Sequence, residues 1–495
     1  MKMKLFFKNS VLYAALFSGL LIGTGCKKHL DINTDPNTPA VDQGTPRLVF
    51  PAAVMATAGR VGGDLAILGA LWGQYATQSS LSSQYRQLDA YNVDGSQLNG
   101  PYTGLFAGGL KNYQFVIDKS AEVEDWNFYL MATVMKAYTA QVLVDIYDQI
   151  PYFEALKGSD NLNPKFDDGY TIYKDLLAIL DTALGKNFSA STLTNPGTTD
   201  LVFGGNMDNW KRFANTLQLK MYLRMINAKA AEAQAGVQKL YARNATFLTV
   251  DASVTGFTNI KGKGNPMYEQ NIRELNTATN LRASKTFVLF LQDNNDPRIT
   301  YNFGSATPNS LHQGDYTNNT DASYNTAASL VQRATDPVVF ISQAESYFLQ
   351  AEARERYFAG AGAKALYDAG VLSAFTAEGA NGTTFIAAAG KYAYPVAGTL
   401  SQKIEAISVQ KWVSFSYGLH FIEGFFEKNR TGFPRTSPVY STSGSYVPGQ
   451  LVVAKNSVLG PSQFPKRLVF PDVETIRNTE APAVVPITTP VWWAL

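Results

Sequence analysis

Two segments of the sequence combine aromatic and amide side chains at a density that suits sugar binding. In the first, Leu71 to Asn99, we expect ligand contacts from Trp72, Tyr75, Gln78, Tyr85 and Tyr91. In the second, Tyr301 to Tyr324, we expect them from Tyr301 and Tyr316, which stand among several asparagines. Sugars stack their C–H faces on aromatic rings, and planar amides bind their hydroxyls. These residues are the predicted ligand-binding set.

The aromatic residues of the first segment differ in how strongly their sequence neighbours indicate that they are exposed to solvent. Trp72 and Tyr75 are three residues apart, so on a helix they would share a face that could equally pack inward. Tyr85 and Tyr91 are flanked by polar residues, which favours exposure. We therefore expect alanine at Trp72, Tyr85 or Tyr316 to weaken calcium-independent oligosaccharide binding without lowering the melting temperature.

Enzyme chemistry has weaker support in the sequence. Asp145 with Asp148, and Glu352 with Glu355, could act as the acid and base of a glycosidase. Residues one helical turn apart point the same way, however, and do not flank a glycosidic bond. Three histidines and one cysteine give no usual zinc ligand set. We predict no catalytic residues, no metal site and no cofactor; Asp293 to Asp296 is oxygen-rich but lacks a complete calcium-loop pattern.

The N-terminus has the features of an export signal. Lys2, Lys4 and Lys8 precede an apolar stretch, Val11 to Ile22, and small residues lead to the only cysteine, Cys26. This resembles a bacterial lipobox, although Gly23 stands where a bulky aliphatic residue is usual. We predict a lipoprotein signal peptide over 1–25, lipidation of Cys26 and a polar tether over 26–45; an ordinary signal peptide with an incidental cysteine is the alternative.

The charge balance excludes one class of partner. The chain has 495 residues with 42 Lys plus Arg against 40 Asp plus Glu, a formal net charge of +2. Without a basic excess or a run of basic residues, nucleic acid binding is not expected. Removal of the signal would take three lysines and no acidic residue with it, leaving a nearly neutral body.

Apolar residues at steps of three and four predict the helices that must position these side chains. The predicted helices are Asn127–Asp148, Tyr170–Leu184, Trp210–Ala228, Ser342–Phe358, Ala363–Phe375 and Gln402–Tyr417. Pro151 and Gly185 end the first two, which we expect to form a helical hairpin. Long polar loops separate the helices at 187–209, 255–280, 301–326, 377–399 and 435–464. Helix pairs that carry large recognition loops are the expected architecture.

Several segments in order resemble the SusD/RagB family of surface lipoproteins from the Bacteroidota. They are Leu30–Pro39, Tyr147–Leu156, Trp210–Arg224, Asp296–Arg298, Ala344–Ala353, Gln410–Trp412, Asn429–Pro434 and Lys466–Asn478. No single motif is specific, but the ordered series is. One departure is Asn429, where the family usually has a basic residue before Arg430. We expect Arg298 and Arg430 to bind carbonyls or a carboxylate, and Trp210 to lie in the core.

The resemblance implies both a fold and a role. The fold is mostly α: tetratricopeptide-like helix pairs, at about 127–235 and 342–417, form a superhelical scaffold within a body at 46–495 that also has a loop-rich irregular lobe. The role is to capture oligosaccharides at the outer-membrane surface and hand them to a SusC-type TonB-dependent transporter, over which the lipoprotein sits as a lid. A peptide-binding protein on the same scaffold, or a surface glycosidase, are the alternatives.

Overall fold

The computed structural model describes residues 44–189, 193–318 and 321–494. The predicted signal peptide, Cys26 and nearly all of the tether lie outside the described residues. From Pro46 onward the chain forms one compact unit.

The body is mostly helical, as predicted. Its longer helices are α2 (Pro46–Val61), α3 (Asp64–Trp72), α6 (Lys111–Glu122), α7 (Trp126–Tyr147), α8 (Gly169–Leu184), α9 (Met207–Arg224), α10 (Ala230–Ala242), α12 (Lys285–Asp293), α14 (Gln343–Tyr357), α15 (Ala363–Ala377), α16 (Leu400–Ser414) and α17 (Ile422–Thr431). Short helices are α4 (Arg86–Asp89), α5 (Asn99–Thr103), α11 (Pro266–Tyr268), α13 (Arg298–Phe303) and α18 (Asp472–Thr475).

Three pairs of short antiparallel strands join distant parts of the chain. They are β1 (Ala76–Gln78) with β5 (Leu281–Ala283), β2 (Gln149–Pro151) with β3 (Phe166–Asp168), and β4 (Ala252–Val254) with β6 (Val338–Ile341). Each strand is three or four residues long. The strands therefore fasten loops to the helical body and form no extended sheet.

All six predicted helices are present, with ends shifted by a few residues. α7 and α8 form the expected hairpin, and Gly185 caps α8. α9 stops at Arg224, four residues before the predicted end at Ala228. There the chain turns, and Asn227 Nδ2 donates to the Arg430 carbonyl at 2.8 Å.

Several helices were not predicted from the sequence, and burial on all sides can hide the amphipathic period of a helix. α3 is the clearest case, since its residues from Leu65 to Trp72 are all buried and apolar or glycine. Such a helix has no polar face to mark its period. The stretch Pro46–Trp72 is long and apolar enough to cross a membrane, but 72% of the relevant window is buried inside the protein, as in a core helix.

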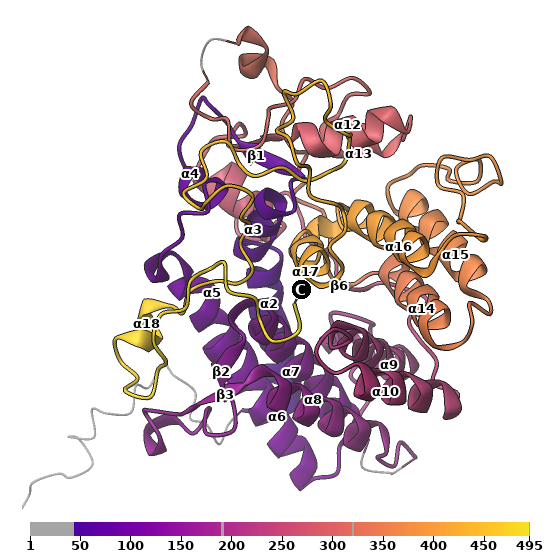
Figure 1. Ribbon diagram of the computed structural model, residues 1–495. Coiled ribbons are helices and arrows are strands. Elements are labelled where there is room, and N and C mark those ends of the chain that lie inside the picture. Colours follow the sequence, from indigo (N-terminus) through magenta and orange to yellow (C-terminus); the bar gives the residue numbers. More distant parts are fainter. Residues whose placement is uncertain (1–43, 190–192, 319–320, 495) are drawn as a thin grey trace, which may run out of the picture. The chain divides into compact units, whose positions relative to one another are not determined.

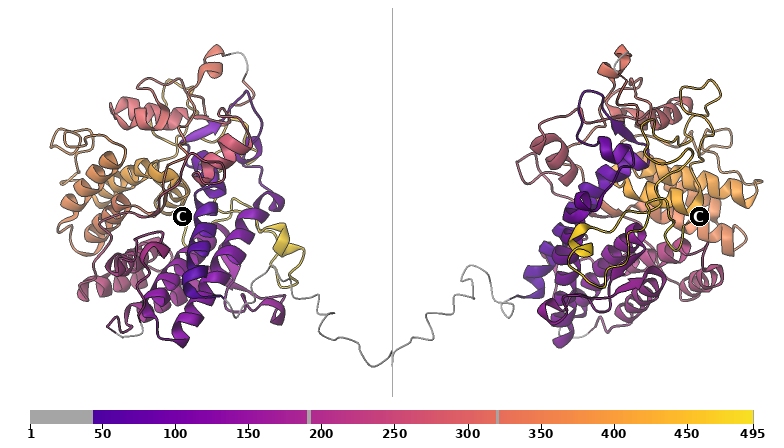
Figure 2. Two further views of the ribbon diagram at one scale, coloured as in Figure 1. Left: turned by 180° about the vertical axis from the view of Figure 1, so that it is seen from behind. Right: turned by 60° about the vertical axis from the view of Figure 1, so that its left-hand side comes forward.

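The loops and the helices occupy different regions of the body. In Figure 1 β1, α12 and α13 lie at the top among loops, α7 and α8 lie at the bottom, and α14 to α16 lie to one side. In both views of Figure 2 the loop segments also lie at the top of the body, at the opposite end from α7 and α8. The predicted scaffold with a loop-rich lobe is thus present. Three segments far apart in sequence, 71–99, 301–324 and 435–464, build that lobe.

A buried group of charges, here called the central ion network, lies where the helices meet. Its members come from five helices, and their side chains are at most 3% exposed. They are Asp145 of α7, Lys220 and Arg224 of α9, Glu345 and Glu352 of α14, Lys411 of α16, and Glu423, Glu427 and Arg430 of α17. Four cations thus face five carboxylates.

Arg430 shows how tightly this network is bonded. Its guanidinium donates to both Glu352 oxygens at 2.8 and 2.6 Å, and to both Glu427 oxygens at 3.0 and 2.7 Å. Burial alone would raise the pKa of Glu352, but Arg430 and Arg356 lower it to about 2. Lys220 and Arg224 likewise outweigh burial and lower the pKa of Glu423 to about 2. These carboxylates are therefore charged in the folded protein.

The C-terminal segment packs against the central ion network. Trp493 is fully buried, and its indole N–H donates to Asp145 Oδ1 at 2.8 Å. The Arg224 guanidinium lies 5.0 Å from the centre of the Trp493 ring. This end of the chain therefore acts as a plug on the helical body.

Replacing Arg430 by methionine should destabilise the protein by about 3 to 5 kcal/mol, because Glu352 and Glu427 would keep their charge in the core with fewer partners. The matched control is Arg435→Met, whose partner Glu405 lies on the surface, with side-chain exposures of 55% and 30% for the pair. That change should cost about 1 kcal/mol or less. Urea unfolding of both variants measures the difference; equal small losses would contradict the central role of the network.

Candidate functional site

A buried carboxylate, Asp89, joins the two predicted sequence segments. Asp89 Oδ2 accepts from Thr77 Oγ1 at 2.8 Å and from the Gln78 backbone N–H at 3.0 Å, while Oδ1 accepts from Gln313 Nε2 at 2.7 Å. Burial raises the pKa of Asp89 to about 6, although these hydrogen bonds oppose the shift. Gly314 N–H also donates to Thr77 Oγ1 at 2.9 Å. The segments 71–99 and 301–324 thus form one structure.

A stacked pair on the surface adds a second link between these segments. The guanidinium carbon of Arg86 lies 5.3 Å from the centre of the half-buried Tyr316 ring. Arg86 is itself held by the carbonyls of Ser82 and Ser80, at 3.1 and 3.3 Å. Tyr316 is therefore a partly exposed aromatic ring in a fixed position, as its prediction as a ligand contact requires.

The C-terminal loop 435–464, which the sequence predicted only as one of five long loops, contributes to the same lobe. Tyr440 O–H donates to the Gln313 carbonyl at 2.7 Å, and Asn456 Nδ2 donates to the Gly314 carbonyl at 2.7 Å. His312 lies beside Tyr440, with ring centres 5.7 Å apart. The only sequence signal for this contribution was the length of the loop.

Trp72 and Tyr75 are core residues, so the structure contradicts their prediction as ligand contacts. Trp72 is 3% exposed, donates its indole N–H to the Leu88 carbonyl at 2.9 Å and packs its ring on Phe425. Tyr75 is fully buried, and its hydroxyl donates to the Trp412 carbonyl at 2.7 Å. Trp72 lies where α3 packs against α17, and Tyr75, which follows α3, lies against Trp412 of α16; these contacts explain their burial.

Gln78 and Tyr91 are also inside. Gln78 uses its amide within the chain: Oε1 accepts from the Tyr85 backbone N–H at 2.7 Å, and Nε2 donates to Ser82 Oγ at 2.7 Å. Tyr91 is 1% exposed and lies edge-on to Trp72. Polar neighbours in the sequence did not predict exposure here, because the turn itself is covered by the C-terminal loop, where Val458 N–H donates to the Ala90 carbonyl at 2.9 Å.

Tyr301 has a structural partner. Its half-buried ring lies 4.5 Å from the guanidinium carbon of Arg333, whose Nη2 donates to the Tyr301 carbonyl at 3.1 Å. The ring is thus covered on one face. Its contact with a ligand stays a prediction.

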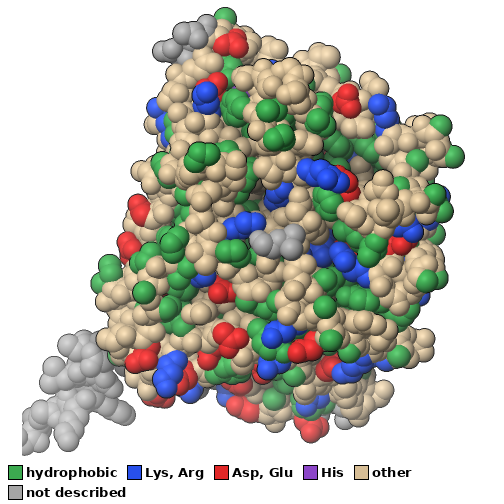
Figure 3. Space-filling model, viewed as in Figure 1, with side chains coloured by type: hydrophobic (Ala, Val, Ile, Leu, Met, Phe, Trp, Pro, Cys, Tyr) green, Lys and Arg blue, Asp and Glu red, His purple; other side chains and the backbone are tan. Residues whose placement is uncertain are grey.

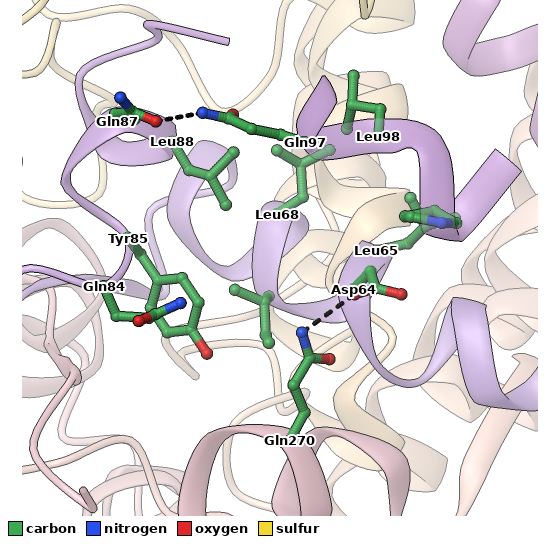
Figure 4. Close-up of a pocket in the computed structure, with 12 residues that line it drawn as sticks. Asp64, Leu65, Leu68, Gln84, Tyr85, Gln87, Leu88, Gln97, Leu98 and Gln270 are labelled. Atoms are coloured by element: carbon green, nitrogen blue, oxygen red, sulfur yellow. Dashed lines mark hydrogen bonds between the residues drawn. The ribbon is translucent and has the colours of Figure 1, made fainter. Parts of the chain in front are cut away.

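Tyr85 is 5% exposed but lines a cavity, here called the Tyr85 cavity. The cavity has a volume of about 340 Å³ and is built on α3, with α4 and the turn at 95–98 on other sides (Figure 4). Its aliphatic lining is Leu65, Ile67, Leu68, Leu88, Leu98 and Pro101, and its polar lining is Asp64, Gln84, Tyr85, Gln87, Gln97 and Gln270. An apolar floor with amides around it is typical of a small-molecule pocket.

The polar groups of the cavity are partly paired with one another. Gln97 Nε2 donates to Gln87 Oε1, and Gln270 Nε2 donates to Asp64 Oδ1 at 3.0 Å. Among the described residues the buried Tyr85 hydroxyl has no hydrogen-bond partner, and neither has Gln97 Oε1. Burial and the nearby Asp64 carboxylate raise the pKa of Tyr85, so the hydroxyl stays protonated and able to donate.

The carboxylate pairs considered for catalysis are occupied by structural contacts. Asp148 pairs with Arg467 at 3.5 Å, and Glu355 with Lys403 at 3.1 Å, while Asp145 and Glu352 belong to the central ion network. Asp296, in the oxygen-rich turn, accepts from Arg298 and Tyr392. Within the described part of the chain no group of three or more His, Cys, Asp or Glu is placed to hold a metal ion.

The loop lobe also differs from the scaffold in its surface charge. On the face seen in Figure 3, acidic and basic side chains gather over the helical part at the bottom of the view, and fewer lie at the top. The top corresponds to the loop segments around β1. This face of the lobe therefore suits a ligand without strong charge.

Comparisons with known proteins agree with this architecture. The SusD-like family model, described as starch-binding and associating with the outer membrane, matches residues 64–451. A SusD-like structure from Bacteroidetes AC2a superposes with a TM-score of 0.73 at 18% identity, covering 91% of this chain and 100% of that one. These findings confirm the predicted fold of helix pairs with a loop-rich lobe. No curated protein matches the chain.

Two further solved structures are similar at comparable levels. A chitin-binding protein superposes with a TM-score of 0.72 at 21% identity, covering 91% of this chain and 100% of that one. A chitin-binding SusD homologue from Flavobacterium johnsoniae gives 0.68 at 20% identity, with coverage of 89% and 98%. At this identity the likeness concerns the fold.

The corrected position of Trp72 changes the expected effect of its removal. Trp72→Ala should lower the stability by about 3 to 5 kcal/mol, because it empties a packed site between α3 and α17. Tyr316→Ala, at a half-buried surface ring, should cost about 1 kcal/mol or less. Thermal and urea unfolding of the two variants test this; a Trp72→Ala protein as stable as the wild type would contradict the packing described.

Proposed function

The chain belongs to the SusD-like family, and from this we propose that it is a surface glycan-binding lipoprotein that captures oligosaccharides and hands them to a SusC-type TonB-dependent transporter in the outer membrane. The match of the family model over residues 64–451 carries the proposal. Two chitin-binding proteins among the similar structures support carbohydrate as the ligand class.

The proposed binding surface is the loop lobe around Tyr316 and the Tyr85 cavity. Tyr316 offers a partly exposed ring for stacking, and Arg86 holds that ring from one side. Tyr85 and Gln87, which flank Arg86 in sequence, both line the cavity. An aromatic ring and an amide-lined pocket therefore meet at one short turn, which combines the two kinds of contact that sugars use.

Binding without turnover fits the chemistry of the described residues. The carboxylate pairs that could have served a glycosidase are engaged in ion pairs, and two of their members hold helices together through the central ion network. A glycosidase needs one carboxyl free to donate a proton and one free to attack or activate water. We therefore infer a binding protein rather than an enzyme.

The site itself is tested by binding measurements on purified protein. Tyr316→Ala should weaken binding of the captured oligosaccharide about tenfold, since it removes the stacking surface. The control is Tyr170→Ala on α8, a partly buried tyrosine that also lies beside lysines, at 4.6 Å from Lys174. Calorimetry with a glycan panel, and with a peptide pool beside it, gives the affinities.

The possible results separate the site from the function. Unchanged affinity in Tyr316→Ala would show that the ligand binds elsewhere on the protein. Binding of peptides but of no glycan by the wild type would replace the proposed ligand class.

The proposed anchor is a lipid on Cys26. Each buried CH₂ of an acyl chain contributes about 0.8 kcal/mol, and two or three chains hold a soluble body at a membrane. Cys26→Ser should therefore move the protein from the membrane fraction to the soluble fraction after cell lysis. If Cys26→Ser stays in the membrane fraction like the wild type, the lipid anchor is contradicted.

The partner is tested by affinity capture from solubilised membranes. The wild-type protein should retain a transporter, and capture without a transporter would contradict the proposed partner.

A further inference from the structure

The Tyr85 cavity has a floor that a plain sugar ring would fill poorly. Leu65, Ile67 and Leu68 of α3 line it and are only 1 to 2% exposed. A sugar hydroxyl placed against these side chains loses its hydrogen bonds to water, which weakens binding. A methyl group in the same place removes apolar surface from water, which strengthens binding. The floor therefore favours a ligand unit that carries a small apolar substituent.

The polar groups of the cavity fit an amide beside that substituent. The Tyr85 hydroxyl is buried and has no hydrogen-bond partner among the described residues, so an amide carbonyl of a ligand would satisfy it as a donor. In Figure 4 Gln84 lies beside the Tyr85 ring and Gln270 lies across from it, and the carbonyl oxygens of glutamine side chains can accept from an amide N–H. A methyl group joined to an amide is an acetamido group.

Charge and size narrow the ligand further. No Lys or Arg lines the cavity, and its one charged member, Asp64, is bonded to Arg60 and Gln270. An anionic sugar would face this carboxylate without a cation of its own, and that repulsion disfavours binding. The volume of about 340 Å³ is at the small end of ligand pockets, so it suits one sugar unit of a longer chain.

We propose that the Tyr85 cavity binds the acetamido group of an N-acetylated sugar unit within a neutral oligosaccharide. The proposal rests on the proposed function, because it names the ligand class of the same lobe. In it, the Tyr85 hydroxyl donates to the acetamido carbonyl, a glutamine amide oxygen accepts from the acetamido N–H, and the methyl group packs on Leu65, Ile67 and Leu68.

Three hexasaccharides test the proposal by calorimetry: the β-1,4 hexamer of N-acetylglucosamine, the same hexamer fully deacetylated, and cellohexaose, which has the same linkage and a hydroxyl in place of the acetamido group. Maltohexaose serves as an unrelated neutral glucan. The wild type should bind the acetylated hexamer at least about tenfold more tightly than the other three.

Two phenylalanine variants locate the effect. Tyr85→Phe keeps the ring and removes the donor, so the preference for the acetylated hexamer should fall about tenfold while cellohexaose affinity stays the same. Tyr91→Phe is the matched control, because it removes a hydroxyl from another buried ring that does not line the cavity. Its selectivity should equal that of the wild type.

The outcomes distinguish the acetamido site from the proposed glycan-binding function on which it rests. Equal affinity for the acetylated hexamer and cellohexaose, or selectivity unchanged in Tyr85→Phe, overturns the acetamido site and leaves the glycan-binding function standing. Binding of maltohexaose and of none of the other three hexasaccharides would also overturn the acetamido site and leave the glycan-binding function standing. Failure of all four to bind overturns the acetamido site, and the wider glycan and peptide panels then decide the function.

Discussion

The central ion network is the constraint on which the rest of the structure depends. Charges removed from water cost several kcal/mol each unless well-placed opposite charges surround them. Here five helices must meet so that Lys220, Arg224 and Arg430 each contact two or more carboxylates. No helix of this set can shift alone without leaving a buried charge unpaired. The network therefore fixes the positions of α7, α9, α14, α16 and α17 relative to one another.

The same helices place the candidate site. α3 packs directly on α17: a Cβ added at Gly69 would lie 2.2 Å from the Ile422 nitrogen, so only glycine allows this approach. α16 holds the segment that follows α3, since the Trp412 indole N–H donates to the Gly73 carbonyl at 2.9 Å and the Trp412 backbone carbonyl accepts from the Tyr75 hydroxyl at 2.7 Å. Because α3 is the floor of the Tyr85 cavity, the packing of the scaffold helices determines where this cavity lies in the lobe.

Sequence reasoning recovered the scaffold well and the site poorly, for a physical reason that particular residues show. The family motifs include many of the network's charges: Lys220 and Arg224 in 210–224, Glu345 and Glu352 in 344–353, Lys411 in 410–412, and Arg430 in 429–434. Most of these charges contact more than one partner, which restricts the residue types that can stand there, so the pattern around them is recognisable. Of the predicted ligand contacts, by contrast, Trp72, Tyr75, Gln78 and Tyr91 lie in the interior, while Tyr85 and Tyr316 lie at a cavity and on the surface.

The sequence by itself determined the helix pairs, the long loops, the near-neutral body and the family to which the chain belongs. These follow from local periodicity and from motifs that each lie within a short stretch of chain. Only the tertiary structure decided which aromatic rings face solvent and that Tyr85 looks into a cavity. The exposure of a side chain depends on which other residues cover it. Phe425 covers Trp72, and Gln270 lies beside Tyr85 in the cavity lining. These pairs are distant in sequence, so they come into contact only when the helices pack.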